Sequence, residues 1–417
     1  MLAVTSFCQI AFTVSGRADA GSGFYWSRCS YAPVTELCWS GCSERGLHMR
    51  GQWLGPYTGA VNGKAMINID EVKDHFEAVA YLAPSNSAIP GSVAYLSTTN
   101  KDEDQTATAY IAPIDPRTGF QGKWEDVKGL YGEGVVHSSE AKVNLKIQNN
   151  RLYISAVSDV GVTLAATLDK SSGNGESKIQ GQRKSWDDFK SNISSISTSK
   201  LSYLFRGQKE PWSLRTSFHR RGRYRMSEFT GKDVRQLHQR LSAITSHFFD
   251  LAKPEQNGAF FNLLQHHGYP TPLLDWTYSP YVAAFFAFRD RPIGYDGDEV
   301  VRIHLFNNQE WQKLFPQIQN LDPAFPHLSV MEFIAIANPR IVPQQAVTTV
   351  TNLEDIEGYI LEKEAETGMR FLEAIDIPAN EREKAMRDLR FMGITAGSMF
   401  PSIDGVCEEL RERNFDQ

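Results

Sequence analysis

One continuous stretch constrains this chain more than any other part of its sequence. Gln265–Pro280 holds two histidines, an aspartate and three prolines, and it runs directly into the largely apolar segment Tyr281–Phe288. Ser279 and Pro280 are typical of the N-cap and the first position of a helix. The stretch therefore predicts a loop, a short strand at Leu273–Trp276, and then a helix that is buried on nearly every side.

The polar side chains of this stretch gather just before the predicted helix. A helix N-terminus offers unpaired N–H groups and the positive end of the helix dipole, so Asp275, Thr277 and Ser279 stand where an anionic ligand or a developing charge could be held. In a purely structural interpretation, Asp275 and Ser279 cap the helix, and His266 and His267 satisfy backbone groups. So many such side chains in one stretch favour a functional site.

The composition indicates a globular chain of roughly two or three domains. Its 417 residues carry a formal net charge of −6, which gives no electrostatic reason for tight binding to nucleic acid or to a membrane surface. No segment approaches the about 18 consecutive apolar residues that a membrane-spanning helix needs. We therefore expect a soluble protein with no membrane partner.

Residues 1–48 lack clear periodicity and hold four of the five cysteines. A signal peptide is one interpretation, but the apolar start Leu2–Val14 has no Lys or Arg before it. A zinc knuckle is another, but Cys38 and Cys42 have no second ligand pair at a suitable spacing. We expect residues 1–48 to be an extension outside the fold. Because only Cys407 remains in the rest of the chain, we expect a cytoplasmic protein.

Residues 49–170 have the alternating pattern of β-strands. The expected strands are 65–70, 75–82, 91–96, 106–112, 141–147 and 151–157. Asn149-Asn150 is a hairpin-turn signal, whereas Gly51–Gly59 is expected to be a turn-rich opening. Several short strands without helices predict an all-β sandwich or barrel. It carries no catalytic cluster, which suggests a binding, sensing or scaffolding module.

Residues 171–184 are expected to be a linker, because Ser171–Lys178 consists mostly of polar and small residues. A mixed α and β module should follow at 185–417, beginning with a short helix at Trp186–Lys190. Its expected strands are 201–208, 299–306, 333–340, 346–350 and 371–377, and helices are expected at 380–392 and after Met399. The spacing is too irregular for a Rossmann repeat, and the GxGxxG and GxxxxGK[ST] loops are absent.

Arg206 stands at the end of the apolar strand predicted for residues 201–208. A guanidinium at the end of a buried strand is costly without an anionic partner, so Arg206 is a functional candidate. An internal salt bridge is the structural alternative. Gly207 would let a backbone or a ligand approach closely.

Two further segments have a recognisable pattern. His219–Arg225 is basic and contains an aromatic residue, as nucleic-acid-binding loops do, although a solvated basic face is the commoner reason for such a run. Asp233–Leu251 predicts a long amphipathic helix.

Several of these motifs together resemble the FRG domain family, which is named for its Phe-Arg-Gly motif. They are Phe205–Gln208, His266–Ala287, Met392–Thr395 and Phe400-Pro401. The resemblance covers about residues 185–413. The family is widespread in bacteria and phages, so the resemblance implies a bacterial protein and suggests a setting in conflict, such as phage defence.

A wider resemblance is to ADP-ribosyltransferases, which are built from a split β-sheet. These enzymes use an Arg or His on an early strand, a Ser/Thr-x-Ser/Thr leading into a helix, and a Glu or Gln on a late strand. Arg206, Thr277-x-Ser279 and Gln344-Gln345 stand in this order. The resemblance implies a split sheet in this module, NAD as the substrate, no metal, and a macromolecular acceptor, either nucleic acid or protein.

The same resemblance implies roles for individual residues. Arg206 would hold a phosphate or ribose of NAD, while Thr277 and Ser279 would brace the nicotinamide end of the site. Gln345 would contact the ribose hydroxyl beside the developing oxocarbenium. Glutamine lacks the negative charge of a catalytic glutamate, which favours a nucleic-acid acceptor or an inactive site. The catalytic candidates are Arg206, His266, His267, Asp275 and Gln345, and the cofactor-binding candidates are Phe205, Arg206, Gly207, Gln208, Tyr269, Thr271, Trp276, Thr277 and Ser279.

Two other classes of function stay open. A hydrolase or nuclease could use His266 or His267 as general base, with Asp275 fixing the tautomer of the imidazole. No GxSxG motif accompanies them, so a free or metal-bound water would have to attack. Metal ligation by adjacent histidines and Asp275 is awkward, because neighbours on a strand point to opposite faces. The remaining class is a non-catalytic ligand-binding module.

Overall fold

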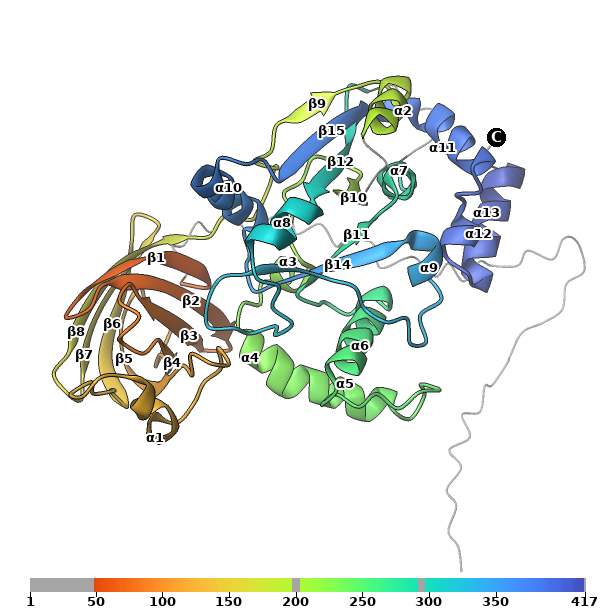
Figure 1. Cartoon of the computed structure of the whole chain (residues 1–417). Coiled ribbons are helices and arrows are strands. Elements are labelled where there is room, and N and C mark those ends of the chain that lie inside the picture. Colours follow the sequence, from red (N-terminus) through yellow and green to blue (C-terminus); the bar gives the residue numbers. More distant parts are fainter. Residues whose placement is uncertain (1–48, 197–202, 292–296, 416–417) are drawn as a thin grey trace, which may run out of the picture. The chain divides into compact units, whose positions relative to one another are not determined.

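The computed structural model describes residues 49–196, 203–291 and 297–415 (Figure 1). The extension expected at residues 1–48 lies outside the described residues. Leu47–Gln417 form one compact unit. Within it, a closed eight-stranded antiparallel barrel is followed by a seven-stranded sheet with helices. The expected all-β module and mixed α/β module are therefore confirmed, and the first is a barrel rather than a sandwich.

The barrel runs as a meander in which each strand pairs with the next. Its strands are β1 (Gly51–Gly59), β2 (Gly63–Val72), β3 (His75–Pro84), β4 (Ser92–Ser97), β5 (Asp104–Pro113), β6 (Glu140–Gln148), β7 (Arg151–Ser158) and β8 (Thr163–Lys170). β1 closes the barrel by pairing with β8. All six expected strands are confirmed. The expected turn-rich opening is wrong, because Gly51–Gly59 is β1, which pairs with strands on both sides.

The barrel interior is filled by side chains. Alternate residues of β6 are buried and exposed, so one side of the strand faces the core. Small residues such as Ala78 and Ala80 share the interior with the large rings of Trp53 and Phe76. The indole Nε1 of Trp53 donates a hydrogen bond of 2.7 Å to the carbonyl oxygen of Met49. This packing is typical of an eight-stranded barrel.

The second module is built on one seven-stranded sheet in the order β13-β14-β11-β10-β12-β15-β9. Its strands are β9 (Gly181–Arg183), β10 (Tyr203–Gln208), β11 (Leu273–Thr277), β12 (Val300–Asn307), β13 (Leu328–Met331), β14 (Ala346–Thr351) and β15 (Leu372–Pro378). β9 pairs in parallel with β15 and every other pair is antiparallel. The segment 171–184, expected to be a linker, thus contributes a strand to this sheet.

The sheet is parted between the neighbouring strands β10 and β11. β10 pairs with β12 along its whole length, but β10 and β11 share the single residue pair Phe205 and Thr277. Arg206 follows Phe205 directly, so it lies where the two halves of the sheet separate. At this opening, the Phe-Arg-Gly segment of β10 lies next to the Asp-Trp-Thr segment of β11.

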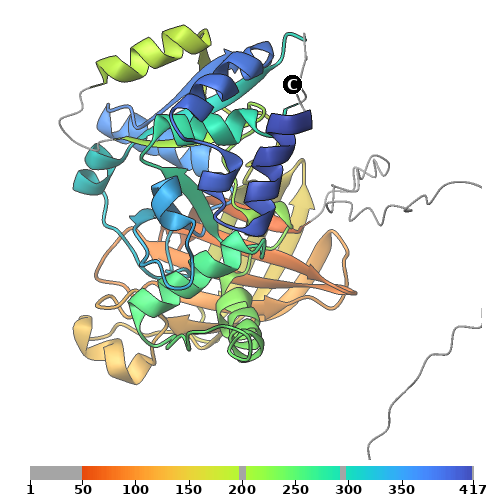
Figure 2. The same ribbon diagram turned by 90° about the vertical axis from the view of Figure 1, so that its right-hand side faces the viewer.

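Helices cover both faces of the sheet. One face packs against α2 (Trp186–Ser195), α7 (Pro280–Phe288) and α11 (Arg382–Phe391). The other packs against α8 (Asn308–Leu314) and α10 (Ile356–Thr367). Both views place α12 (Ala396–Met399) and α13 (Ile403–Phe415) beside α7 (Figures 1 and 2). An Arg289–Glu408 ion pair of 2.6 Å joins the end of α7 to α13.

The helix expected over Asp233–Leu251 is much shorter in the structure. A π-helical turn at Phe229–Asp233 leads into α5 (Val234–Leu241), where the helix ends. The carbonyl oxygen of Leu241 still accepts from the backbone N–H groups of Ile244 and Thr245, both at 2.9 Å, and the Thr245 hydroxyl adds a third bond at 3.0 Å, so the backbone leaves the helix only after this turn. Ile244 and Phe248, expected on the buried stripe, are 79% and 68% exposed.

The strand expected at residues 333–340 is also wrong, because no strand forms there. Ala337 has a φ of 53°, which lies outside the extended region. The side chain of Asn338 donates to Asn262 Oδ1 at 2.6 Å and so ties the segment to α6 (Pro254–His266).

The two modules are joined by buried polar contacts. Gln52 of β1 donates to the carbonyl oxygen of Asn352 at 2.7 Å and accepts from the N–H of Glu354 at 3.0 Å. Asp70 of β2 accepts from the N–H of Tyr224 at 2.7 Å. Arg225 forms ion pairs with Asp70 and with Glu77 of the barrel. Part of the basic run at His219–Arg225 is thus used to hold the modules together.

Within the described ranges, no helix has the length and apolarity required to cross a bilayer.

Candidate functional site

The local structure of the central stretch follows the sequence pattern closely. The Oγ of Ser279 accepts from the N–H of Val282 at 3.3 Å, and Pro280 opens α7, so the expected N-cap and first position are confirmed. α7 is buried along nearly its whole length. Because α7 is part of the core, its first residues and the end of β11 just before them are fixed in position.

Arg206 is the charged residue at the opening of the sheet. Its Nη1 donates a hydrogen bond of 2.6 Å to the carbonyl oxygen of Asp275. Among the described residues, Arg206 forms no ion pair with a carboxylate, so the structural alternative of an internal salt bridge is not found and a backbone contact is present instead. Its buried Nε has no hydrogen-bond partner among these residues. Burial lowers the pKa of Arg206 to about 10, and the negative charge of Asp275 opposes this shift.

His304 is a site residue that the sequence analysis missed. It lies opposite Arg206 in the β10–β12 register, so both side chains share one face of the sheet. His304 is completely buried, and neither ring nitrogen has a hydrogen-bond partner among the described residues. Burial, together with Arg302 and Arg206, moves its pKa well below 6.5, so the imidazole is neutral. The signal for it was a histidine between the apolar residues Ile303 and Leu305 of a predicted strand.

Gln208 adds a third unsatisfied group on the same face. It is two residues after Arg206 in β10, and its buried Oε1 has no partner in the described part of the chain. Buried polar atoms almost always have a hydrogen-bond partner, since an unpaired one costs about 1–3 kcal/mol. The unpaired atoms of Arg206, Gln208 and His304 therefore mark a place where a polar ligand or ordered water would be stabilised.

Thr277 connects β11 to the beginning of β14. Its hydroxyl donates to the carbonyl oxygen of Gln344 at 2.7 Å and accepts from the N–H of Ser279 at 3.0 Å. The N–H of Tyr278 donates to the carbonyl oxygen of Gln345 at 3.1 Å. These bonds fix the Thr-Tyr-Ser segment against the approach to β14.

Gln345 is held in an uncommon backbone conformation. It ends the short helix α9 (Ile341–Gln344) with φ 47° and ψ 45°, in the left-handed region, and its side chain is exposed. Its neighbour Gln344 is buried and donates from Nε2 to the carbonyl oxygen of Met399 at 2.9 Å. Gln344 is therefore a structural residue, and Gln345 is the one that faces solvent beside Thr277 and Tyr278.

Asp275 belongs to a chain of side-chain hydrogen bonds that starts at Thr271. Thr271 donates to Gln265 Oε1, and Gln265 Nε2 donates to Asp275 Oδ1. Thr271 is completely buried, and its N–H donates to the hydroxyl of Ser217 at 2.9 Å. Thr271 therefore acts through Gln265 to fix the carboxylate of Asp275.

The two histidines of the motif are not oriented by Asp275. The Nδ1 of His266 lies 2.8 Å from the carbonyl oxygen of Asn262, within the same helix. Arg340 donates to the carbonyl oxygen of His266 at 3.1 Å. His267 caps the end of α6 and is exposed. No His–Asp275 hydrogen bond is present among the described residues, so the geometry expected for a histidine base is absent.

The remaining candidates hold the scaffold. A side chain at Gly207 would collide with the carbonyl oxygen of Ala283, so glycine lets α7 pack directly on β10. Phe205 is buried under α7. Trp276 lies in the core on the other face, where its Nε1 donates to Thr349 at 3.0 Å. Tyr269 donates to Asp233 at 3.3 Å.

Two guanidinium groups flank an aromatic ring near Gln345. The guanidinium of Arg289 lies 4.3 Å from the centre of the Phe400 ring, and that of Arg340 lies 5.3 Å from it. Phe400 follows Met399, the residue whose carbonyl oxygen binds Gln344. The Phe400-Pro401 motif is thus brought to the beginning of β14, beside two guanidinium groups, of which that of Arg289 is already paired with Glu408.

No cluster of three or more His, Cys, Asp or Glu side chains that could bind a metal is found in the described ranges. The described cavity of about 1000 Å³ is not lined by Arg206, Asp275 or Gln345.

Comparison with known proteins identifies one domain. Residues 201–293 match the FRG domain family, a segment that contains β10, α6, β11 and α7. Comparisons with curated proteins and with solved structures found no match. The chain therefore contains an FRG domain, which holds Arg206 and the central stretch.

Proposed function

We propose that this FRG domain protein is an NAD-dependent enzyme of the ADP-ribosyltransferase type that acts on a macromolecule. The observation that supports it most is the meeting of three segments that are distant in the sequence. Arg206 bonds to Asp275, Phe205 pairs with Thr277, and Thr277 bonds to Gln344. These segments carry the early arginine, the Thr-x-Ser and the late glutamines to which the resemblance assigns the NAD site.

The polar atoms around Arg206 suit a nucleotide substrate. Arg206 Nε can donate a hydrogen bond, and Gln208 Oε1 can accept one from a ribose hydroxyl. The neutral imidazole of His304 offers one donor and one acceptor. A guanidinium also binds phosphate oxygens well. In this proposal, Arg206 and its two neighbours bind and orient the NAD.

The reaction breaks the bond between nicotinamide and the ribose, and the electron pair of that bond leaves with nicotinamide. The nucleophilic atom of the acceptor forms the new bond to the same ribose carbon and releases its proton to solvent. Positive charge develops on the ribose, and the Gln345 carbonyl dipole would stabilise it less than a carboxylate would. A strongly nucleophilic acceptor, such as a nucleic-acid base, therefore fits this site better than a protein side chain.

The test is incubation of the full chain with labelled NAD and separate protein, RNA and DNA acceptors. Wild type should release nicotinamide and transfer label to one acceptor class, whereas Arg206→Ala should lose both activities. Arg151→Ala is the matched control, because Arg151 lies on the exposed face of β7. Gln345→Glu should increase transfer to protein side chains.

Three results would contradict the proposal. One is that wild type neither binds NAD nor releases nicotinamide, which would leave a non-catalytic ligand-binding module as the remaining function. Another is full activity of Arg206→Ala. The third is turnover that is abolished by EDTA, which would indicate a metal-dependent hydrolase instead.

A further inference from the structure

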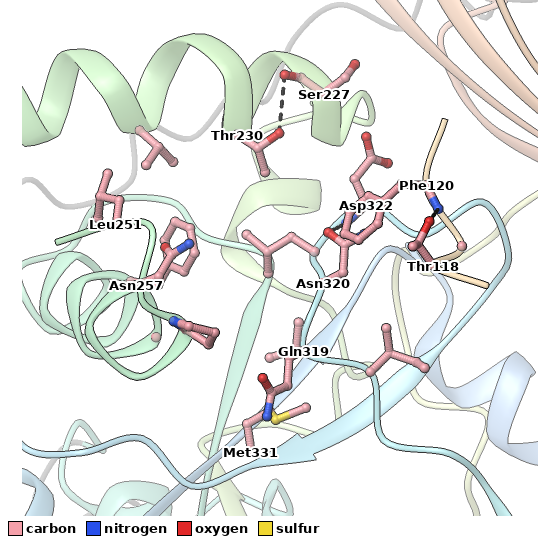
Figure 3. A pocket seen from close by; sticks show the side chains of 18 of the residues that line it. Thr118, Phe120, Ser227, Thr230, Leu251, Asn257, Gln319, Asn320, Asp322 and Met331 are labelled. Atoms are coloured by element: carbon pink, nitrogen blue, oxygen red, sulfur yellow. Dashed lines mark hydrogen bonds between the residues drawn. The ribbon is translucent and has the colours of Figure 1, made fainter. Parts of the chain in front are cut away.

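A cavity of about 1000 Å³ lies between the barrel and the second module, away from Arg206 (Figure 3). Thr118 and Phe120 approach it from the barrel side. Leu251 and Asn257 lie on the wall opposite Phe120 and Asp322, as the close-up shows. A cavity of this size is at the upper end of the about 300–1000 Å³ that is usual for small-molecule sites.

The walls of the cavity are largely aromatic and apolar. The rings of Tyr81 and Tyr95 come from the barrel, and those of Phe261 and Phe333 come from the second module. Flat apolar walls of this kind favour an aromatic ligand, because aromatic rings bury a large area in few rotatable bonds. Both modules are needed to form the site.

The charged residues that line the cavity determine which charge a ligand should carry. Glu255, Asp322 and Glu332 supply three carboxyl groups, and Arg235 is the one guanidinium. An anionic ligand would meet net repulsion here, whereas a cation would be attracted. This distinguishes the cavity from the Arg206 site, which suits a phosphate-bearing substrate.

Two hydrogen-bond acceptors of the lining have capacity for a ligand. The buried Oδ1 of Asn257 has no partner among the described residues. Asp322 accepts from the hydroxyl of Tyr81 at one oxygen, which leaves further acceptor capacity on the carboxyl group. The hydroxyl of Tyr95 is already directed to Gln121 at 2.8 Å. A ligand with N–H groups matches these two acceptors.

We propose that this cavity is a binding site for a small aromatic amine, whose N–H groups donate to Asn257 Oδ1 and to the Asp322 carboxylate. The ligand is held between the barrel and the second module. Its binding does not depend on the activity proposed for the Arg206 site.

One wall of the cavity is connected to the central stretch. Glu332 accepts a hydrogen bond from the hydroxyl of Tyr278, which stands between Thr277 and Ser279. The carboxyl group of Glu332 keeps acceptor capacity beside this bond, as that of Asp322 does. The cavity and the Thr-Tyr-Ser segment of the central stretch thus share Glu332.

The test uses the full chain and 2-aminobenzimidazole as the probe, followed by ligand-observed NMR and calorimetry without NAD. Wild type should bind it, and Asp322→Asn should weaken binding by about tenfold, because a charge-assisted bond is lost. Thr118→Trp should weaken binding, because the larger side chain narrows the cavity on the barrel side. Thr118 is exposed, so this change should leave the fold intact. Asp169→Asn, on the outside of β8, is the matched control and should bind like wild type.

Two comparison probes test whether the cavity recognises the N–H donors and the charge of the ligand. 1-Methylindole, which has no N–H donor, and benzoate, which is an anion, should both bind at least about tenfold more weakly than 2-aminobenzimidazole. The proposal is overturned if the amine does not bind to wild type, if benzoate binds as tightly, or if Asp322→Asn and Thr118→Trp bind like wild type.

Discussion

Arg206 Nη1 lies 2.6 Å from the carbonyl oxygen of Asp275, at the point where β10 and β11 share a single residue pair. The bond holds together the two halves of a parted sheet through a side chain rather than through a ladder of backbone bonds. A buried guanidinium whose Nε has no partner among the described residues costs free energy, which makes Arg206 a candidate ligand-binding group.

Arg206→Lys should show that charge alone does not replace this guanidinium. A lysine lacks the planar guanidinium with its several N–H donors. The variant therefore loses both the hydrogen bond from Nη1 to the carbonyl oxygen of Asp275 and the Nε donor that could bind a ligand. We expect a loss of about 1–3 kcal/mol in the free energy of unfolding and loss of NAD binding. Urea denaturation and calorimetry measure the two effects. Arg151→Lys, in an exposed pair with Asp169, should change stability by less than about 1 kcal/mol.

Thr277→Val should destabilise the approach to β14. Valine has nearly the same shape but removes the donor to Gln344 and the acceptor for Ser279. The free energy of unfolding should fall by about 1–3 kcal/mol, because a buried carbonyl oxygen loses its partner. Thr277→Ser keeps the hydroxyl and is the control. Equal stability of Thr277→Val and Thr277→Ser in urea would show that these bonds contribute nothing.

Gln345→Gly should stabilise the protein by about 1 kcal/mol, because a left-handed conformation strains any residue with a Cβ. The bonds made by the backbone of Gln345 to Val342 and Tyr278 do not need the side chain. Gln345→Ala keeps the Cβ and should show no gain. The midpoint of urea denaturation distinguishes the two variants, and a glycine variant that is less stable than the alanine variant would contradict the expectation.

Buried histidines should make the protein sensitive to acid, and His219 and His327 add to the effect of the buried His304. Burial lowers the pKa of His219 to about 3, with Arg215 adding to the effect, and burial lowers the pKa of His327 to about 4. The unfolded chain takes up these protons near the ordinary pKa of about 6.5, whereas the native protein does not. Stability should therefore be complete above about pH 6.5 and fall as the pH drops towards 4.

Each of these histidines can contribute a slope of up to about 1.4 kcal/mol per pH unit. His327→Asn should flatten the fall in Tm between pH 6.5 and 4 relative to wild type. A variant whose Tm changes in parallel with wild type over this range would rule out His327 as one of the groups.

Asp322→Asn should have the opposite dependence on pH. Burial raises the pKa of Asp322 to about 6, although the hydrogen bond from Tyr81 opposes the shift. The native protein thus binds this proton more tightly than the unfolded chain, and the carboxyl group costs stability as the pH rises through about 4 to 6. Relative to wild type, the variant should gain in Tm between pH 4.5 and pH 7.5. A constant difference in Tm would contradict the raised pKa.

Local patterns in the sequence were enough to predict many of the elements. Alternation predicted six of the barrel strands, and Ser279-Pro280 predicted the start of α7. The position of Arg206 at the end of a strand was also predicted correctly. These features depend on neighbours within a few residues, through side-chain periodicity and helix capping, so the sequence itself contains the information.

Other features depended on which distant segments pair. His304 became a neighbour of Arg206 because β12 pairs with β10 in one register, and a shift by one residue would turn it to the other face. Gly51–Gly59 became a strand because β2 and β8 supply partners for its backbone.

The sequence by itself thus determined six strands of the barrel and the capped start of α7, because periodicity and capping act over a few residues. Only the tertiary structure decided that the carbonyl oxygen of Asp275, rather than a carboxylate, binds Arg206, and that His267 is exposed. The physical reason is that burial and hydrogen-bond partners are set by contacts between segments far apart in the chain, which no local pattern specifies.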